Sequence, residues 1–118
     1  MARGFDLEER TTNFGKSVVR LCKSLPSNPI NDRLIGQVVG ASGSIGANYR
    51  EANDALGKKD FLLRIKISRR EAKESHHWLD LILEANEDKK AGILSLLTEA
   101  TELKKILSSI INKSESNS

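Results

Sequence analysis

The run VVGASGSIG at residues 38–46 resembles, at first reading, a site for a dinucleotide cofactor. Its three glycines imitate the glycine turn of a dinucleotide-binding fold, and Asp60 follows at about the expected distance of 20 residues. That turn must follow a buried strand and open a helix, and a second strand must lead into the acidic residue. Residues 30–37 instead have a helical pattern with polar residues at 31–33 and 37, and the segment 49–60 contains no apolar strand. We therefore predict no cofactor.

Glu74 and His77 have the Glu-x-x-His spacing that places both side chains on one face of a helix, as in di-iron bundles. Such a site needs a second Glu-x-x-His pair and two more inward glutamates, but the only other histidine is the adjacent His76. Carboxylates such as Glu71, without a nucleophile or a metal beside them, make a poor acid–base pair. We predict no metal site and no catalytic residue, so the protein is not expected to be an enzyme.

The segment 58–73 could instead bind phosphate. It holds seven basic side chains against two acidic ones, a net charge of +5, which leaves −2 for the rest of the chain. Several of its cations recur at steps of three, four and seven residues, and His77 continues this stripe on one side of a helix. Such a stripe can follow a phosphate backbone, although an ordinary solvated helix face is the alternative. The predicted nucleic-acid-binding residues are Lys58, Lys59, Lys66, Arg69, Arg70 and Lys73.

Four segments with apolar residues at helical spacing must position these side chains. The first runs from Leu7 to Leu25 and ends at Pro26, and the second opens at Asn28 and Pro29. The apolar seam of the third runs from Phe61 to Ile82. A polar corner follows at 86–90, and the fourth segment has a seam from Ile93 to Ile110. Short connections between helices of similar length favour antiparallel neighbours. The sequence predicts an all-α, antiparallel up-down-up-down four-helix bundle over residues 1–113, with a disordered tail at 114–118.

Composition agrees with a single helical domain. The chain has 118 residues, of which 38% are hydrophobic and 30% charged, with two prolines. Its only cysteine, Cys22, is expected to be a small buried helix residue, and the absence of a disulfide suits a reducing compartment. The N-terminal residues have no apolar signal region, and no long apolar run follows. We expect a cytoplasmic protein with no membrane partner.

Small residues form a second row along the second predicted helix, at steps of four, three and four. A glycine inside a helix costs roughly 1 kcal/mol relative to alanine, so this row implies a compensating close contact with another helix or subunit. Polar residues on or beside the apolar seam can bond across the same kind of contact and fix its register. The predicted oligomer or inter-helix contact residues are Gly36, Gly40, Gly43, Ala47, Asn48 and Glu51.

Two sequence blocks, SIGANYREA at 44–52 and KKDF at 58–61, precede a segment with Glu71, Ala72, Glu74 and Trp78-Leu79. In this order they resemble the four-helix bundle family of 23S rRNA intervening-sequence proteins, most densely over residues 37–82. The resemblance implies a ring-shaped homopentamer without enzymatic activity. It also implies that RNA or DNA, and a protein partner, are candidates, because related accessory proteins of diversity-generating retroelements bind nucleic acid and a reverse transcriptase.

The leading hypothesis from the sequence is therefore a non-catalytic, homo-oligomeric bundle that presents the basic stripe of residues 58–73 to RNA or DNA. The alternative is an oligomeric scaffold or adaptor that binds only protein partners.

Overall fold

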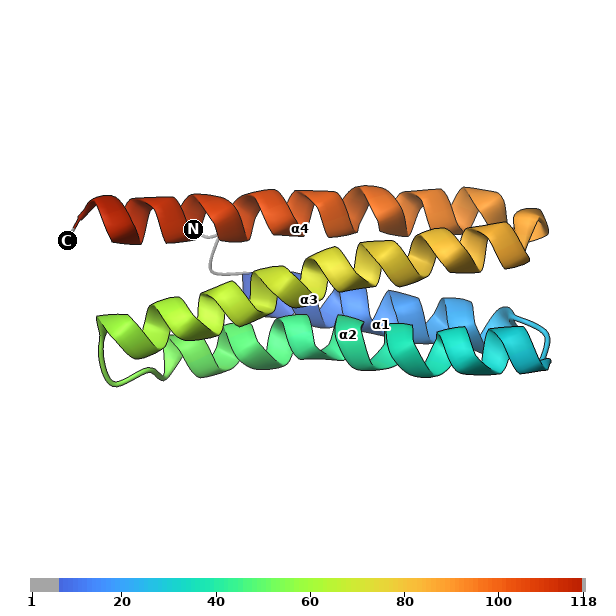
Figure 1. Cartoon of the computed structure of the whole chain (residues 1–118), viewed down its shortest axis with the longest axis horizontal. Helices are drawn as coiled ribbons and strands as arrows, with labels where there is room; N and C mark the ends of the chain where they lie inside the picture. Colours follow the sequence, from blue (N-terminus) through green and yellow to red (C-terminus); the bar gives the residue numbers. More distant parts are fainter. Residues whose placement is uncertain (1–6, 118) are drawn as a thin grey trace.

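The computed structural model describes residues 7–117 and consists of four long helices packed side by side (Figure 1). These are α1 (Leu7–Ser24), α2 (Pro29–Asn53), α3 (Lys58–Ala85) and α4 (Lys90–Ser116), with the short 3₁₀ helix η2 (Glu87–Lys89) before α4. Consecutive helices run in opposite directions, and no strand occurs between residues 7 and 117. The predicted all-α four-helix bundle is confirmed.

The core is built from the apolar seams that the sequence predicts. Ile45, Ile65 and Leu103 have no exposed surface, and Ser68 and Ser75 are equally buried on the seam of α3. The Ser68 hydroxyl donates to the Ile45 carbonyl oxygen at 2.8 Å and so connects α3 with α2. Cys22 is buried in α1 as predicted, and this burial raises the pKa of its thiol.

Local sequence signals explain where α1 ends and α2 begins. Helix α1 stops at Ser24, two residues before Pro26, whose ring cannot continue a helix. The Asn28 side-chain oxygen accepts a hydrogen bond from the backbone N–H of Asn31 at 2.8 Å, and Pro29 occupies the first turn of α2. Helix α2 begins where the sequence predicts, and α1 ends one residue before the predicted Leu25.

The C-terminal end differs from the sequence prediction, because α4 continues through Ser116 where a disordered tail was expected from residue 114. The Lys66 ammonium lies 3.0 Å from the Glu115 carboxylate, so the last turn of α4 makes an ion pair with α3. The Ser116 hydroxyl also donates to the Lys113 carbonyl oxygen at 3.1 Å. Residue 118 and the first six residues lie outside the described part of the chain.

Two buried asparagines, 55 residues apart in the sequence, meet at one end of the bundle. The Asn31 Nδ2 donates to Asn86 Oδ1 at 3.0 Å, and the Asn86 Nδ2 donates back to Asn31 Oδ1 at 2.9 Å. Their remaining N–H groups donate to the carbonyl oxygens of Pro26 and Ile82, at 2.8 and 2.9 Å. This amide pair fixes the loop after α1 and the start of α2 against the end of α3, because both side chains are buried and satisfied.

Each helix packs mainly against the helices that precede and follow it in the sequence. Helix α2 packs mainly on α3, α3 on α4 and α1 on α2, whereas α1 and α4 have far fewer contacts. None of the helices within residues 7–117 combines the length and apolar character needed to cross a bilayer.

Candidate nucleic-acid interface

Helix α3 carries the basic segment along its outward side. Lys59, Lys66, Arg70 and Lys73 are exposed, whereas Ile65 and the other seam residues point into the core. This separation follows from the sequence, because steps of three, four and seven residues keep side chains on one side of a helix. Lys58 is the first residue of α3, at the end of the bundle.

Hydrogen bonds and ion pairs divide the predicted cations into two groups. Lys66 pairs with Glu115 at 3.0 Å, and Arg69 is half-buried and donates to the Ser108 hydroxyl at 3.4 Å. Arg70 lies 3.7 Å from Glu71 with its side chain 64% exposed, which makes this a weak pair in water. Lys59 and Lys73 make no hydrogen bond or ion pair with any described residue. Arg70, Lys59 and Lys73 are therefore the cations most available to a ligand.

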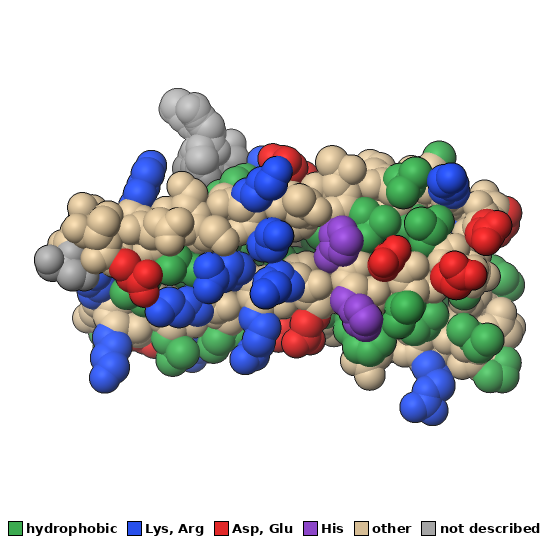
Figure 2. Space-filling model, turned by 45° about the horizontal axis from the view of Figure 1, so that its top comes forward, with side chains coloured by type: hydrophobic (Ala, Val, Ile, Leu, Met, Phe, Trp, Pro, Cys, Tyr) green, Lys and Arg blue, Asp and Glu red, His purple; other side chains and the backbone are tan. Residues whose placement is uncertain are grey.

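Helix α4 adds two cations that the sequence analysis did not select. The half-buried Lys104 shares a surface hollow with Lys73 of α3, and Lys105 follows it on the exposed side of α4. Figure 2 shows most basic side chains of this face gathered over one half of it, with the histidines at their border, while acidic side chains lie in both halves. The adjacent lysines are visible in the sequence, but only the α3–α4 register shows that Lys104 lies beside Lys73.

The row of small residues on α2 points away from the bundle. A Cβ atom added to Gly36, Gly40 or Gly43 would have open space around it, so no other helix of the described chain approaches these three positions. Gly46 differs, because its Cβ would lie 3.1 Å from the Thr11 hydroxyl of α1. A contact inside the chain therefore accounts for Gly46 but not for the exposed glycines.

The other predicted contact residues lie near this row. Ala47 and Glu51 are exposed. Asn48 is half-buried, donates to the Ser44 carbonyl oxygen at 2.9 Å, and accepts from Arg64 of α3 at 3.4 Å. Next to the row, α1 and α2 enclose a groove of about 390 Å³ whose lining combines the apolar Val19 and Val39 with three basic residues of α1, Lys16, Arg20 and Lys23. The outer side of α1 and α2 thus presents apolar and basic side chains beside the glycine row.

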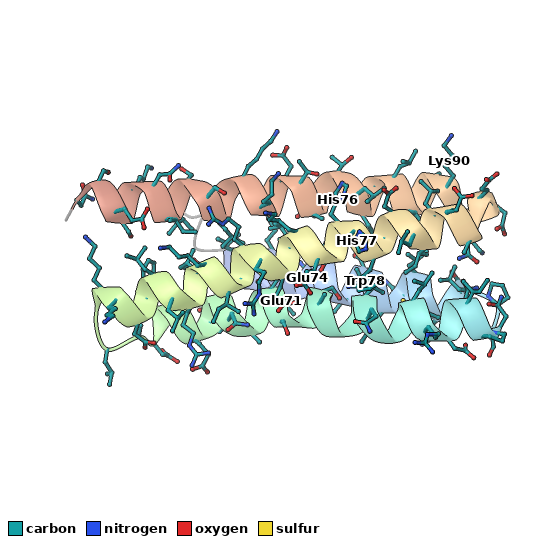
Figure 3. All side chains as sticks on the ribbon, viewed as in Figure 1. Glu71, Glu74, His76, His77, Trp78 and Lys90 are labelled. Carbon is teal, nitrogen blue, oxygen red and sulfur yellow. The ribbon has the colours of Figure 1, made fainter. Side chains whose placement is uncertain are left out.

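The Glu-x-x-His pair is not assembled into a site. His77 packs edge-on against Trp78, with ring centroids 4.9 Å apart and an angle of 66° between the planes. Figure 3 shows His76 on the side of α3 toward α4, and Glu71 and Trp78 on the side toward α2. Between residues 7 and 117, no group of three or more His, Cys, Asp or Glu side chains could hold a metal ion.

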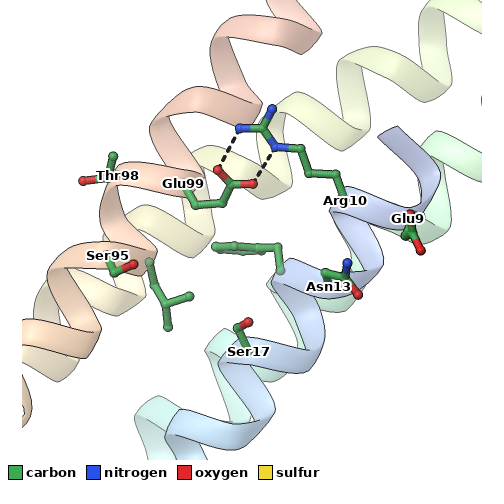
Figure 4. A pocket seen from close by; sticks show the side chains of 9 residues that line it. Glu9, Arg10, Asn13, Ser17, Ser95, Thr98 and Glu99 are labelled. Atoms are coloured by element: carbon green, nitrogen blue, oxygen red, sulfur yellow. Dashed lines mark hydrogen bonds and ion pairs between the residues drawn. The ribbon is translucent and has the colours of Figure 1, made fainter. Parts of the chain in front are cut away.

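The sparse contact between α1 and α4 leaves a groove of about 690 Å³ (Figure 4). Phe14 and Leu96 lie among its lining residues, and Arg10 spans it with two hydrogen bonds to Glu99, at 2.7 and 2.8 Å. The hydrogen bond with Glu99 raises the pKa of Arg10. Because Arg10 and Glu99 satisfy each other, the polar groups that the groove offers a ligand are the Glu9 carboxylate and the hydroxyl and amide groups of its lining.

Comparisons with known proteins agree with this architecture. The family model described as "23S rRNA-intervening sequence protein" matches residues 5–109. A solved structure from Bacteroides thetaiotaomicron, described as a protein of unknown function from the S23 ribosomal protein family, is 30% identical, with a TM-score of 0.77. The alignment covers 88% of this chain and 96% of that one. A search of curated proteins found no match. The chain therefore belongs to the 23S rRNA-intervening sequence protein family.

Proposed function

We propose that this protein is a non-catalytic, homo-oligomeric bundle that binds RNA or DNA through the phosphate backbone. The observation that carries the proposal is the basic face, defined here as Lys59, Lys66, Arg70 and Lys73 of α3 with Lys104 and Lys105 of α4. The described contacts leave Lys59, Lys73 and Lys104 without a hydrogen bond or ion pair, and the pairs made by Arg70 and Lys105 are long, at 3.7 and 3.9 Å. Such cations are free to exchange solvent for phosphate.

The geometry favours binding with little sequence preference. The basic face spans two neighbouring helices, and it offers charged side chains without a row of exposed aromatic rings on which bases could stack. Repetition of this face in an oligomer would add weak contacts through effective concentration. Affinity should therefore depend on salt and on the length of the nucleic acid more than on its sequence.

A salt titration tests the proposal. We expect the wild-type protein to bind duplex RNA or DNA at low ionic strength, and log affinity to fall linearly with log salt concentration. Each phosphate contact contributes roughly 0.7 to 0.9 to the slope, because each contact releases condensed counterions. Fluorescence anisotropy with a labelled duplex measures both quantities. No binding at low ionic strength would overturn the proposal in favour of a scaffold that binds only protein.

Self-association is the second part of the proposal, and the exposed glycines of α2 support it. Gly36, Gly40 and Gly43 keep one side of α2 free of side chains, although no described residue of the chain occupies that space. Glycine at each position disfavours the helix by roughly 1 kcal/mol relative to alanine. We infer that a helix of a second copy packs closely against this side, since such a contact would offset the cost.

Replacing all three glycines by alanine separates assembly from folding. We expect the three methyl groups to overpack the contact, so that light scattering shows a mass closer to the 13.1 kDa of one chain than for the wild type. The free subunit should gain about 2 to 3 kcal/mol of helix stability. Gly92→Ala on α4, where a Cβ atom also has open space, is the matched control and should not change the mass. A triple variant with an unchanged mass would contradict the role of these glycines.

A further inference from the structure

A hollow of about 220 Å³ lies between α3 and α4 within the basic face. Ala72 and Ala100 are completely buried in its lining, so neither helix places a large side chain there. The polar part of the lining comes from Lys73 and His76 of α3 and from Thr101 and Lys104 of α4. The hollow therefore combines a space left by small residues with donors from two helices.

We propose that this hollow is a binding site for a phosphate group and that it anchors one phosphate of the nucleic acid, an inference that rests on the function proposed above. Lys73 and Lys104 supply two ammonium groups that make no ion pair or hydrogen bond with any described residue. The His76 ring supplies a further N–H donor. None of the six lining residues is acidic.

The size and partial burial of the site fit a phosphate group. The volume of about 220 Å³ is several times the roughly 30 Å³ that a water molecule takes up in the liquid, so one tetrahedral anion has room to enter. His76, Thr101 and Lys104 are all half-buried, which strengthens their interaction with a charge relative to that on a fully solvated surface. The Thr101 hydroxyl now donates to the Leu97 carbonyl oxygen at 3.1 Å and can rotate to donate to a bound oxygen.

The chain provides a closely matched pair of variants for the test. Lys104→Glu places a carboxylate in the hollow, whereas Lys105→Glu makes the same charge change at the next residue, outside the hollow. We expect Lys104→Glu to weaken binding of a labelled RNA duplex about tenfold more than Lys105→Glu does, since one charge-assisted contact is lost. Circular dichroism establishes that both variants are folded.

A second measurement separates the phosphate group from the polymer. In amide NMR spectra, titration with inorganic phosphate should shift the signals of Lys73, His76, Thr101 and Lys104 in the wild type, and these shifts should be absent in Lys104→Glu. Phosphate shifts without any binding of the duplex would support a site for free phosphate or a nucleotide and overturn its link to nucleic acid.

Two outcomes would overturn the hollow as an anchor. Equal losses of duplex affinity in the two variants, without localised phosphate shifts, would leave the basic face intact as a diffuse charged surface. Wild-type affinity in both variants would remove α4 from the interface altogether.

Discussion

The double substitution Lys59→Glu with Arg70→Glu is expected to weaken duplex binding roughly 100-fold at low salt, since each lost charge-assisted contact is worth about a factor of ten. Both side chains point outward from α3, and neither lies in the core or in the hollow beside α4. The helical content and the oligomer mass should therefore remain those of the wild type. Fluorescence anisotropy measures the change in dissociation constant.

The matched control for this substitution is Lys89→Glu with Lys90→Glu, which makes the same change in net charge at the other end of the bundle. It should reduce affinity only slightly, because screening weakens a charge effect beyond about 10 Å at 0.1 M salt. Equal losses from the two double variants would mean that total charge, rather than the basic face, governs binding.

The substitution Asn86→Ala should lower the free energy of unfolding by about 2 to 4 kcal/mol, because it removes three buried hydrogen bonds and leaves the Asn31 Oδ1 without a partner. For a domain of this size, the loss corresponds to a fall in Tm of roughly 8 to 16 °C. Thermal and urea unfolding measured by circular dichroism test the prediction.

A comparison with Asn28→Ala gives the scale. That substitution removes only the side-chain cap of α2 and should cost about 1 kcal/mol. A double-mutant cycle between Asn31→Ala and Asn86→Ala should show coupling, because each side chain bonds the other in both directions. If Asn86→Ala destabilised the protein no more than Asn28→Ala, this would show that water replaces the hydrogen bond lost by Asn31 Oδ1.

The fold could be predicted because the local sequence pattern of each helix is enough to indicate it. Val18 and Leu103 belong to rows of apolar residues with a period near 3.6. Prolines mark the end of α1 and the start of α2. The outward direction of Lys59 and Arg70 followed from the same periodicity. These features need no knowledge of how the helices pack on one another.

Features that depend on packing between helices could not be predicted in this way. Nothing in the local sequence of Asn86 distinguishes a buried amide from a polar corner, since its partner is 55 residues away. Lys104 likewise becomes part of the basic face only through the register of α4 against α3. The last residues of α4 include Glu115, which pairs with Lys66 of α3, and this is again a contact between distant segments.

The order in which the helices pack also determines how the chain can find its structure. Because α2 packs on α3 and α3 on α4, most contacts form between segments joined by short loops, whose closure costs little entropy. Bundles dominated by such local contacts fold in microseconds to milliseconds. Only the docking of α1 against α4 joins the two ends of the chain, and this is the most sparsely packed junction. The chain can therefore fold one helical hairpin at a time. The long-range contact between α1 and α4 contributes least to the driving force for folding.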